Sequence, residues 1–191
     1  EKKKFMGECN AACDALLTQP QWEEHLYPHV AEAIEVLSLR GVTLGIYTGT
    51  REDALEAQLS YHGISDFFDR DFVRGKDNLR DAGQNNRDLK AAQLRDIVTA
   101  FRARAGADAP VMVIGDSSAD AAAAADAGLL FAGFAVDDTK RKKMKAAGVV
   151  HILRDFGDLP DLVERLIRPV GNDNTPAAKP QAKPKPPQGG G

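Results

Sequence analysis

The fold is decided by residues 111–128, which read VMVIGDSSADAAAAADAG. The apolar residues before Gly115 predict a strand, and the alanines after Ser118 predict a helix. Asp116 and Asp120 then lie at the turn between the two. In an open sheet of parallel strands, ligands bind beyond the carboxyl ends of the strands, and carboxylate oxygens bind hard cations. The stretch therefore predicts a metal site.

Helical and extended patterns alternate along the chain on both sides of this stretch. Strands that alternate with helices favour a parallel sheet with helices on both faces. We therefore expect an α/β, Rossmann-like fold. The patterns predict helices at 30–39, at 51–62 and from residue 88, a basic helix that contains 140–145, strands at 42–47, 67–73, 129–135 and 149–153, and a polar loop at 74–87.

Size and composition are those of a globular protein with one core. The chain has 191 residues, of which 43% are hydrophobic and 28% charged. A net charge of −3 gives no general attraction for nucleic acid, and no apolar run is long enough to span a bilayer. We expect a soluble, cytoplasmic protein that binds neither nucleic acid nor membrane. Its oligomeric state stays open.

We expect three segments along the chain. Residues 1–25 are interpreted as a helical connection or the remnant of a small cap domain, and residues 26–168 as the core domain. Residues 169–191 are rich in Pro, Lys and Gln, a composition that cannot bury a core, and predict a disordered tail.

Three polar motifs occur in an order that resembles the haloacid dehalogenase (HAD) superfamily, in particular its phosphoglycolate phosphatase branch. The run Ile46-Tyr47-Thr48-Gly49-Thr50 resembles the second motif of that family, a strand that ends in Thr or Ser. Lys90 resembles the third motif, and Gly115-Asp116 followed by Asp120 resembles the fourth. The resemblance covers about residues 26–167 and implies a Mg²⁺-dependent phosphohydrolase that acts on a small phosphorylated substrate.

The resemblance also implies a role for each matching residue. Thr48 and Gly49 would bind a phosphoryl oxygen, and Lys90 would offset the negative charge of the phosphate. Lys76 is the alternative for this lysine. Asp116 would bind Mg²⁺, and Asp120 would either bind the ion through water or orient Lys90. The basic helix around Lys140 is interpreted as a solvated face.

One motif of the family has no match. HAD phosphatases begin with a strand that ends in Asp-x-Asp, whose first carboxylate attacks phosphorus. The only early aspartate here is Asp14, which lies in no strand pattern. We therefore expect the first central strand to be missing and the chain to be an N-terminally truncated, inactive fragment. A noncatalytic module that binds a partner is the alternative, and a nucleotide-binding Rossmann domain is a distant third.

Overall fold

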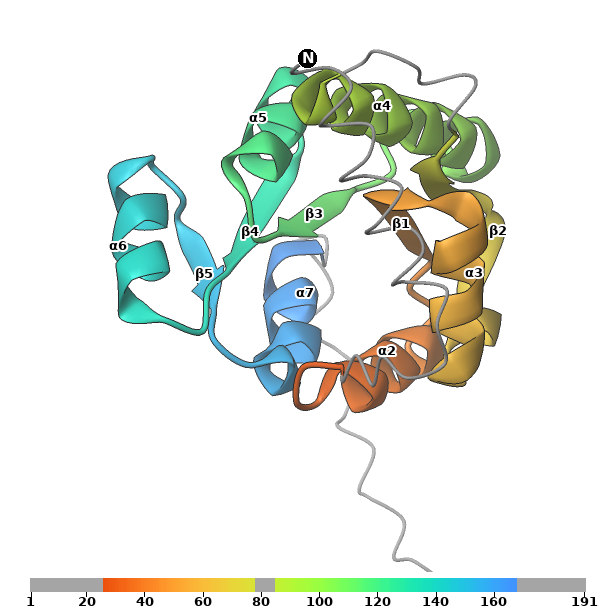
Figure 1. Ribbon diagram of the computed structural model, residues 1–191, viewed down its shortest axis with the longest axis horizontal. Helices are drawn as coiled ribbons and strands as arrows, with labels where there is room; N and C mark the ends of the chain where they lie inside the picture. Colours follow the sequence, from red (N-terminus) through yellow and green to blue (C-terminus); the bar gives the residue numbers. More distant parts are fainter. Residues whose placement is uncertain (1–25, 78–84, 168–191) are drawn as a thin grey trace, which may run out of the picture.

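The computed structural model describes residues 26–77 and 85–167 of the chain (Figure 1). The predicted boundaries of the N-terminal segment and the tail, together with Asp14, lie outside these residues. The described elements are α2 (Val30–Leu39), β1 (Leu44–Arg51), α3 (Glu52–Tyr61), β2 (Phe68–Lys76), α4 (Asn86–Ala105), β3 (Met112–Gly115), α5 (Ser118–Asp126), β4 (Leu130–Phe134), α6 (Asp138–Ala146), β5 (His151–Leu153) and α7 (Leu159–Ile167), with short 3₁₀ turns η1 (Ser65–Phe67) and η2 (Phe156–Asp158).

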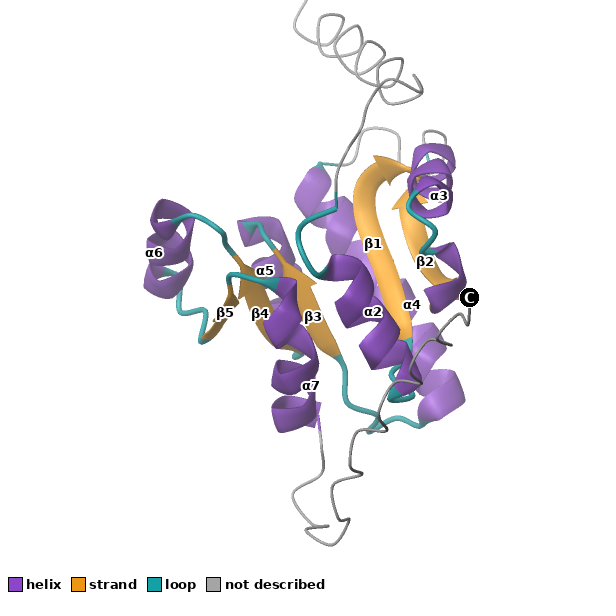
Figure 2. Cartoon of the chain, turned by 90° about the horizontal axis from the view of Figure 1, so that it is seen from below, coloured by secondary structure: helices purple, strands orange, loops and turns teal. Residues whose placement is uncertain are grey.

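The strands form two parallel sheets, which confirms the predicted α/β class. One sheet pairs β1 with β2, and the other has the order β3-β4-β5. Within the described residues, no ladder of backbone hydrogen bonds joins the two sheets. β1 and β3 are the strands that face each other where the two sheets meet, and we call the boundary between these two strands the seam (Figure 2). The free edges of β1 and β3 therefore border this seam.

Helices cover both faces of the sheets and bridge the seam. On one face, α2 and α7 bury Leu37, Leu162 and Val163 in a cluster that also contacts Leu44 of β1 and Ile114 of β3. On the other face, α4 and α5 bury residues such as Leu94 and Ala123 against Val113 of β3, and Tyr47 of β1 packs on this second cluster. Because each cluster takes side chains from both sheets, the two sheets share their hydrophobic cores.

The structure corrects several of the predicted boundaries and adds a helix. The strand predicted at 42–47 is β1, which begins at Leu44 and continues through Thr48 to Arg51. The expected loop at 74–87 is wrong at both ends, because β2 continues to Lys76 and α4 begins at Asn86. Asn85 caps α4 by accepting a hydrogen bond from the Asp88 N–H at 3.0 Å, which explains the early start. The pattern of 159–167 was not assigned to a helix, but its apolar residues recur at helical spacing and form the buried face of α7.

The residue before α2 contacts a residue far along the chain. The helix begins at Val30, as predicted, and His29 is its N-cap, with a left-handed φ of 62°. The ring nitrogen Nδ1 of His29 lies 2.6 Å from Oδ1 of Asp155, which also accepts the Gly157 N–H at 2.7 Å. Hydrogen bonding to Asp155 and its charge raise the pKa of His29, whereas the Gly157 N–H and then His29 lower the pKa of Asp155.

We expect this pair to make stability depend on pH. The raised pKa of His29 means that its contribution is complete below the ordinary histidine pKa of about 6.5 and is lost as the pH rises through the higher folded value. The lowered pKa of Asp155 means that its contribution is lost as the pH falls through a value below the ordinary one. Urea unfolding of the chain and of His29→Gln between pH 5 and 9 measures the first effect, with His62→Gln as the control. A difference between the chain and His29→Gln that does not change with pH would contradict the assignment.

Candidate functional site

The turn after β3 is built around a close contact between Gly115 and Asp120. A Cβ atom at Gly115 would lie 2.3 Å from the Cβ of Asp120, so only glycine fits. Ser117 caps α5: its Oγ accepts the Asp120 N–H at 3.2 Å, while Oδ2 of Asp120 accepts the Ser117 N–H at 3.1 Å. This reciprocal capping box fixes the Asp120 carboxylate at the carboxyl end of the strand.

Lys90 of α4 reaches the same carboxylate. Its Nζ lies 2.8 Å from Oδ1 of Asp120, and the side chains of Lys90 and Asp120 are only 15% and 5% exposed. Burial raises the pKa of Asp120, but the hydrogen bonds from Lys90 and Ser117 and the charge of Lys90 outweigh this effect and hold it below its usual range. Because both carboxylate oxygens of Asp120 already accept hydrogen bonds, these contacts favour the second predicted role, which is to orient Lys90.

The end of β1 is tied to the same helix. Gln93, one turn after Lys90, is buried, and its Nε2 donates hydrogen bonds to the carbonyl of Thr48 at 3.0 Å and to that of Gly75 at 2.8 Å. The Thr48 hydroxyl accepts the Thr50 N–H at 3.2 Å within the last residues of β1, where the pairing with β2 is irregular. A Cβ at Gly49 would lie 2.9 Å from Oδ1 of Asn86 at the start of α4, so the backbone of Gly49 is closely covered.

Tyr47 lies between these two parts of the site. Burial raises the pKa of its hydroxyl, and the negative charge of Asp120 raises it further, so Tyr47 stays neutral. Its buried hydroxyl has no hydrogen-bond partner of ordinary geometry within the described residues, although Asp120 is near enough to act on it electrostatically. Tyr47 thus links the strand that carries Thr48 to the turn that carries Asp120.

Asp116 lies at the exposed rim of the site and is also paired. Its Oδ2 lies 2.5 Å from Nζ of Lys140, which comes from the first turn of α6. The ammonium group of Lys140 therefore stands where a metal cation would contact this carboxylate, and carboxylate oxygen is a suitable ligand for Mg²⁺. Among residues 26–77 and 85–167, no three Asp, Glu, His or Cys side chains gather into a metal site.

The structure brings the predicted residues from three elements to the carboxyl ends of parallel strands. Lys90 contacts Asp120 directly, and Asp116 lies in the same turn after β3. The carbonyl of Thr48 accepts a hydrogen bond from Gln93, which lies on the same helix as Lys90. Lys76 lies at the end of β2, opposite Arg51 in the register of β1 and β2. The contact with Asp120 favours Lys90 as the phosphate lysine.

Three residues of the site were not recognised in the sequence: Tyr47, Gln93 and Lys140. The position of Gln93 one turn after Lys90 was a usable signal, since the two then share a helix face. For Tyr47 and Lys140 no local pattern marks the role, because their partners lie 73 and 24 positions away.

The sequence contains one Asp-x-Asp triplet, Asp69-Arg70-Asp71, but the structure places it at the wrong end of a strand. It lies at the beginning of β2, opposite the carboxyl ends that carry the site. Arg104 contacts both carboxylates, Asp69 at 2.6 Å and Asp71 at 3.9 Å. These aspartates therefore cannot supply the nucleophile.

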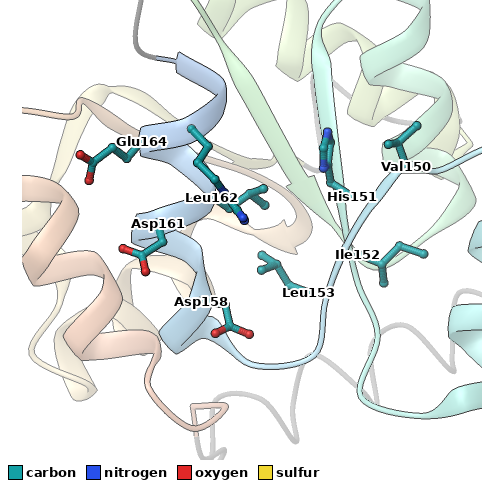
Figure 3. A pocket seen from close by; sticks show the side chains of 9 residues that line it. Val150, His151, Ile152, Leu153, Asp158, Asp161, Leu162 and Glu164 are labelled. Atoms are coloured by element: carbon teal, nitrogen blue, oxygen red, sulfur yellow. The ribbon is translucent and has the colours of Figure 1, made fainter. Parts of the chain in front are cut away.

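A separate pocket of about 660 Å³ lies between β5 and α7 (Figure 3). Its lining combines apolar residues of β5, such as Ile152 and Leu153, with the acidic residues Asp158 of η2 and Asp161 of α7. None of the predicted site residues lines it. The candidate site therefore lies at the carboxyl ends of the strands and not in this pocket.

Comparisons with known proteins place the chain in a family. Residues 9–128, more than half of the chain, match a family described as haloacid dehalogenase-like hydrolases. No curated protein matches the chain. No helix within the described residues has the length and apolar character needed to cross a membrane.

Several solved structures share the fold. A HAD family hydrolase from Deinococcus radiodurans R1, solved with bound phosphate and sodium, is 20% identical with a TM-score of 0.52, over 70% of this chain and 57% of that one. A HAD-superfamily hydrolase from Ehrlichia chaffeensis is 17% identical with a TM-score of 0.53, over 87% and 71%. A phosphoserine phosphohydrolase-like protein from Francisella tularensis is 14% identical with a TM-score of 0.53, over 75% and 65%. The chain thus spans less than two thirds of the first and third of these proteins.

Proposed function

Because the chain belongs to the haloacid dehalogenase-like hydrolases, we propose that it carries the phosphate and metal side of a Mg²⁺-dependent phosphohydrolase. The substrate is a small phosphomonoester, as in the phosphoglycolate phosphatase branch. The observation that carries the proposal is the buried ion pair between Lys90 and Asp120, held beside Asp116 at the end of β3. A fixed cation next to a rim carboxylate suits the binding of a phosphate together with a metal ion.

Each residue has a role in this proposal. The Thr48 hydroxyl and the Gly49 N–H donate to a phosphoryl oxygen, and the Lys90 ammonium offsets the charge that develops on phosphorus oxygens during transfer. Asp120 positions Lys90. Asp116 holds Mg²⁺, which when bound neutralises phosphate charge.

The reaction also needs a nucleophile, which the described residues do not present at this site. We place it on a strand that enters the seam between β1 and β3. Burial supports this placement: β1 has no buried residue and β3 only Val113, whereas β4, inside its sheet, buries Ala132, Gly133 and Phe134. An aspartate on that strand forms a bond to phosphorus while the alcohol leaves and takes a proton from a second acid. Water then attacks phosphorus and releases the carboxylate.

Hydrolysis of p-nitrophenyl phosphate by the full product of the gene tests this proposal. We expect release of p-nitrophenol that requires Mg²⁺, and a loss of about 100-fold in kcat/KM for Lys90→Ala and for Asp116→Asn, because each removes a charge that acts on the transferring phosphate. Lys143→Ala, on the exposed face of α6, is the matched control and should retain its activity. A full gene product that is inactive with and without Mg²⁺ would contradict the enzyme proposal.

A noncatalytic module that binds a partner is the second candidate. It is favoured by one observation: no strand ending in Asp-x-Asp precedes the second motif in this sequence. The same assay separates the two, because such a module shows no hydrolysis in any form of the protein.

A further inference from the structure

The ion pair between Lys140 and Asp116 joins two surface residues that lie far apart in the sequence. Nζ and Oδ2 are 2.5 Å apart, and the side chains are 36% and 58% exposed. The basic helix was predicted to be a solvated face, but Lys140 is paired with Asp116 and is only partly exposed.

Strand register explains why these two residues meet. β3 and β4 run in parallel with Gly115 opposite Gly133, so the segments that follow both strands leave the sheet side by side. The absence of a side chain at Gly133 lets α6 pack closely: a Cβ there would lie 2.7 Å from Sδ of Met144, which is buried. This contact fixes α6 so that its first turn faces Asp116.

The position of Lys140 within its helix is unfavourable on its own. The N-terminal end of a helix carries a partial positive charge, which favours acidic residues and disfavours lysine. Asp137 caps α6 by accepting the Lys140 N–H at 2.7 Å, so Lys140 lies in the first turn. The other end of α6 holds Lys143 and Lys145, where lysine is favourable. The carboxylate of Asp116 offsets the local cost at Lys140.

We propose that the ammonium group of Lys140 occupies the cation position of Asp116, so that a divalent cation binds there only by displacing it. This inference rests on the proposed function, because it concerns the same carboxylate. Lys140 thereby weakens metal binding in the absence of substrate. Once displaced, its positive charge stays at the rim of the site, where an anionic substrate enters.

Binding of Mn²⁺ to this chain tests the proposal. The loss of the electron paramagnetic resonance signal of the free ion measures the binding. We expect Lys140→Gln to bind Mn²⁺ up to about fivefold more tightly than the unchanged chain, since an exposed ion pair contributes at most about that factor. Lys143→Gln removes the same charge from the same helix away from Asp116 and should change the affinity much less. In a protein that already carries Asp116→Asn, Lys140→Gln should not increase the affinity for Mn²⁺.

Three results would overturn the proposal: equal gains for Lys140→Gln and Lys143→Gln, weaker binding by Lys140→Gln, or no Mn²⁺ binding by any form. The first would mean a general effect of charge rather than displacement. Failure of the proposed function is distinguishable from these results. Lys140→Gln could bind Mn²⁺ more tightly while the full gene product hydrolyses no phosphomonoester. That result would support displacement of Lys140 by the cation and contradict only the proposed phosphohydrolase activity.

Discussion

Replacing Asp120 with alanine is expected to lower the free energy of unfolding by about 3 kcal/mol. The substitution leaves the ammonium group of Lys90 largely buried without its partner, and it removes one half of the capping box of α5. Breaking a buried ion pair from one side costs much more than the pair itself contributes, because the remaining charge has lost its water without a compensating contact.

Urea unfolding at pH 7 measures this loss, and Asp69→Ala is the matched control. Asp69 pairs with Arg104 at 2.6 Å, but the Arg104 side chain is half exposed, so we expect a much smaller loss than for Asp120→Ala. Replacing both partners, Lys90→Met with Asp120→Ala, should recover part of the loss, because no unpaired charge is then buried. Equal losses for Asp120→Ala and Asp69→Ala would contradict the buried pair.

The same comparison has a predicted dependence on pH. The pKa of Asp120 is lowered in the folded protein, so its contribution is present above the ordinary carboxyl pKa of about 3.9. It is lost as the pH falls through the lower folded value. The difference between the chain and Asp120→Ala should therefore shrink below about pH 4.

Phe134→Ala is expected to lower the free energy of unfolding by about 3–4 kcal/mol. Phe134 is 6% exposed, and its ring centroid lies 4.8 Å from that of Tyr27 and 4.4 Å from that of Phe156. These rings connect the end of β4 to the segments before α2 and α7, so the substitution leaves a cavity where three separate parts of the chain meet.

Thermal and urea unfolding of Phe134→Ala check this prediction against two other variants. Phe134→Leu fills most of the volume and should cost less than half as much. Leu39→Ala, at a residue that is 81% exposed, should change stability by less than about 0.5 kcal/mol. A small loss for Phe134→Ala would mean that the aromatic cluster does not hold these segments together.

The order of elements was predictable from the sequence because it depends on local pattern. Apolar runs bounded by glycine, such as Val111–Gly115, marked the strands, and helical spacing marked α2 and α4. The boundaries were less predictable where a cap decides them. Asn85 caps α4, which therefore begins at Asn86, two residues before the predicted start.

Asp116 and Asp120 were predicted from the turn that follows a strand, whereas Thr48 and Lys90 were assigned because the order of the motifs resembles that of the HAD superfamily. Their partners were not predictable. Asp120 was assigned to metal binding or to orienting Lys90, and the choice between these depends on which atoms its two oxygens meet. In the structure those atoms belong to Lys90 and Ser117.

The sequence by itself determined the α/β class, the succession of strands and helices, and the turn that carries Asp116, because periodicity and glycine positions act over a few residues. Only the tertiary structure decided that Lys90 is paired with Asp120, that Lys140 is paired with Asp116, and that, within the described residues, no ladder joins β1 to β3. The physical reason is that strand register and helix packing set these contacts. Both depend on residues that meet only after the chain has folded.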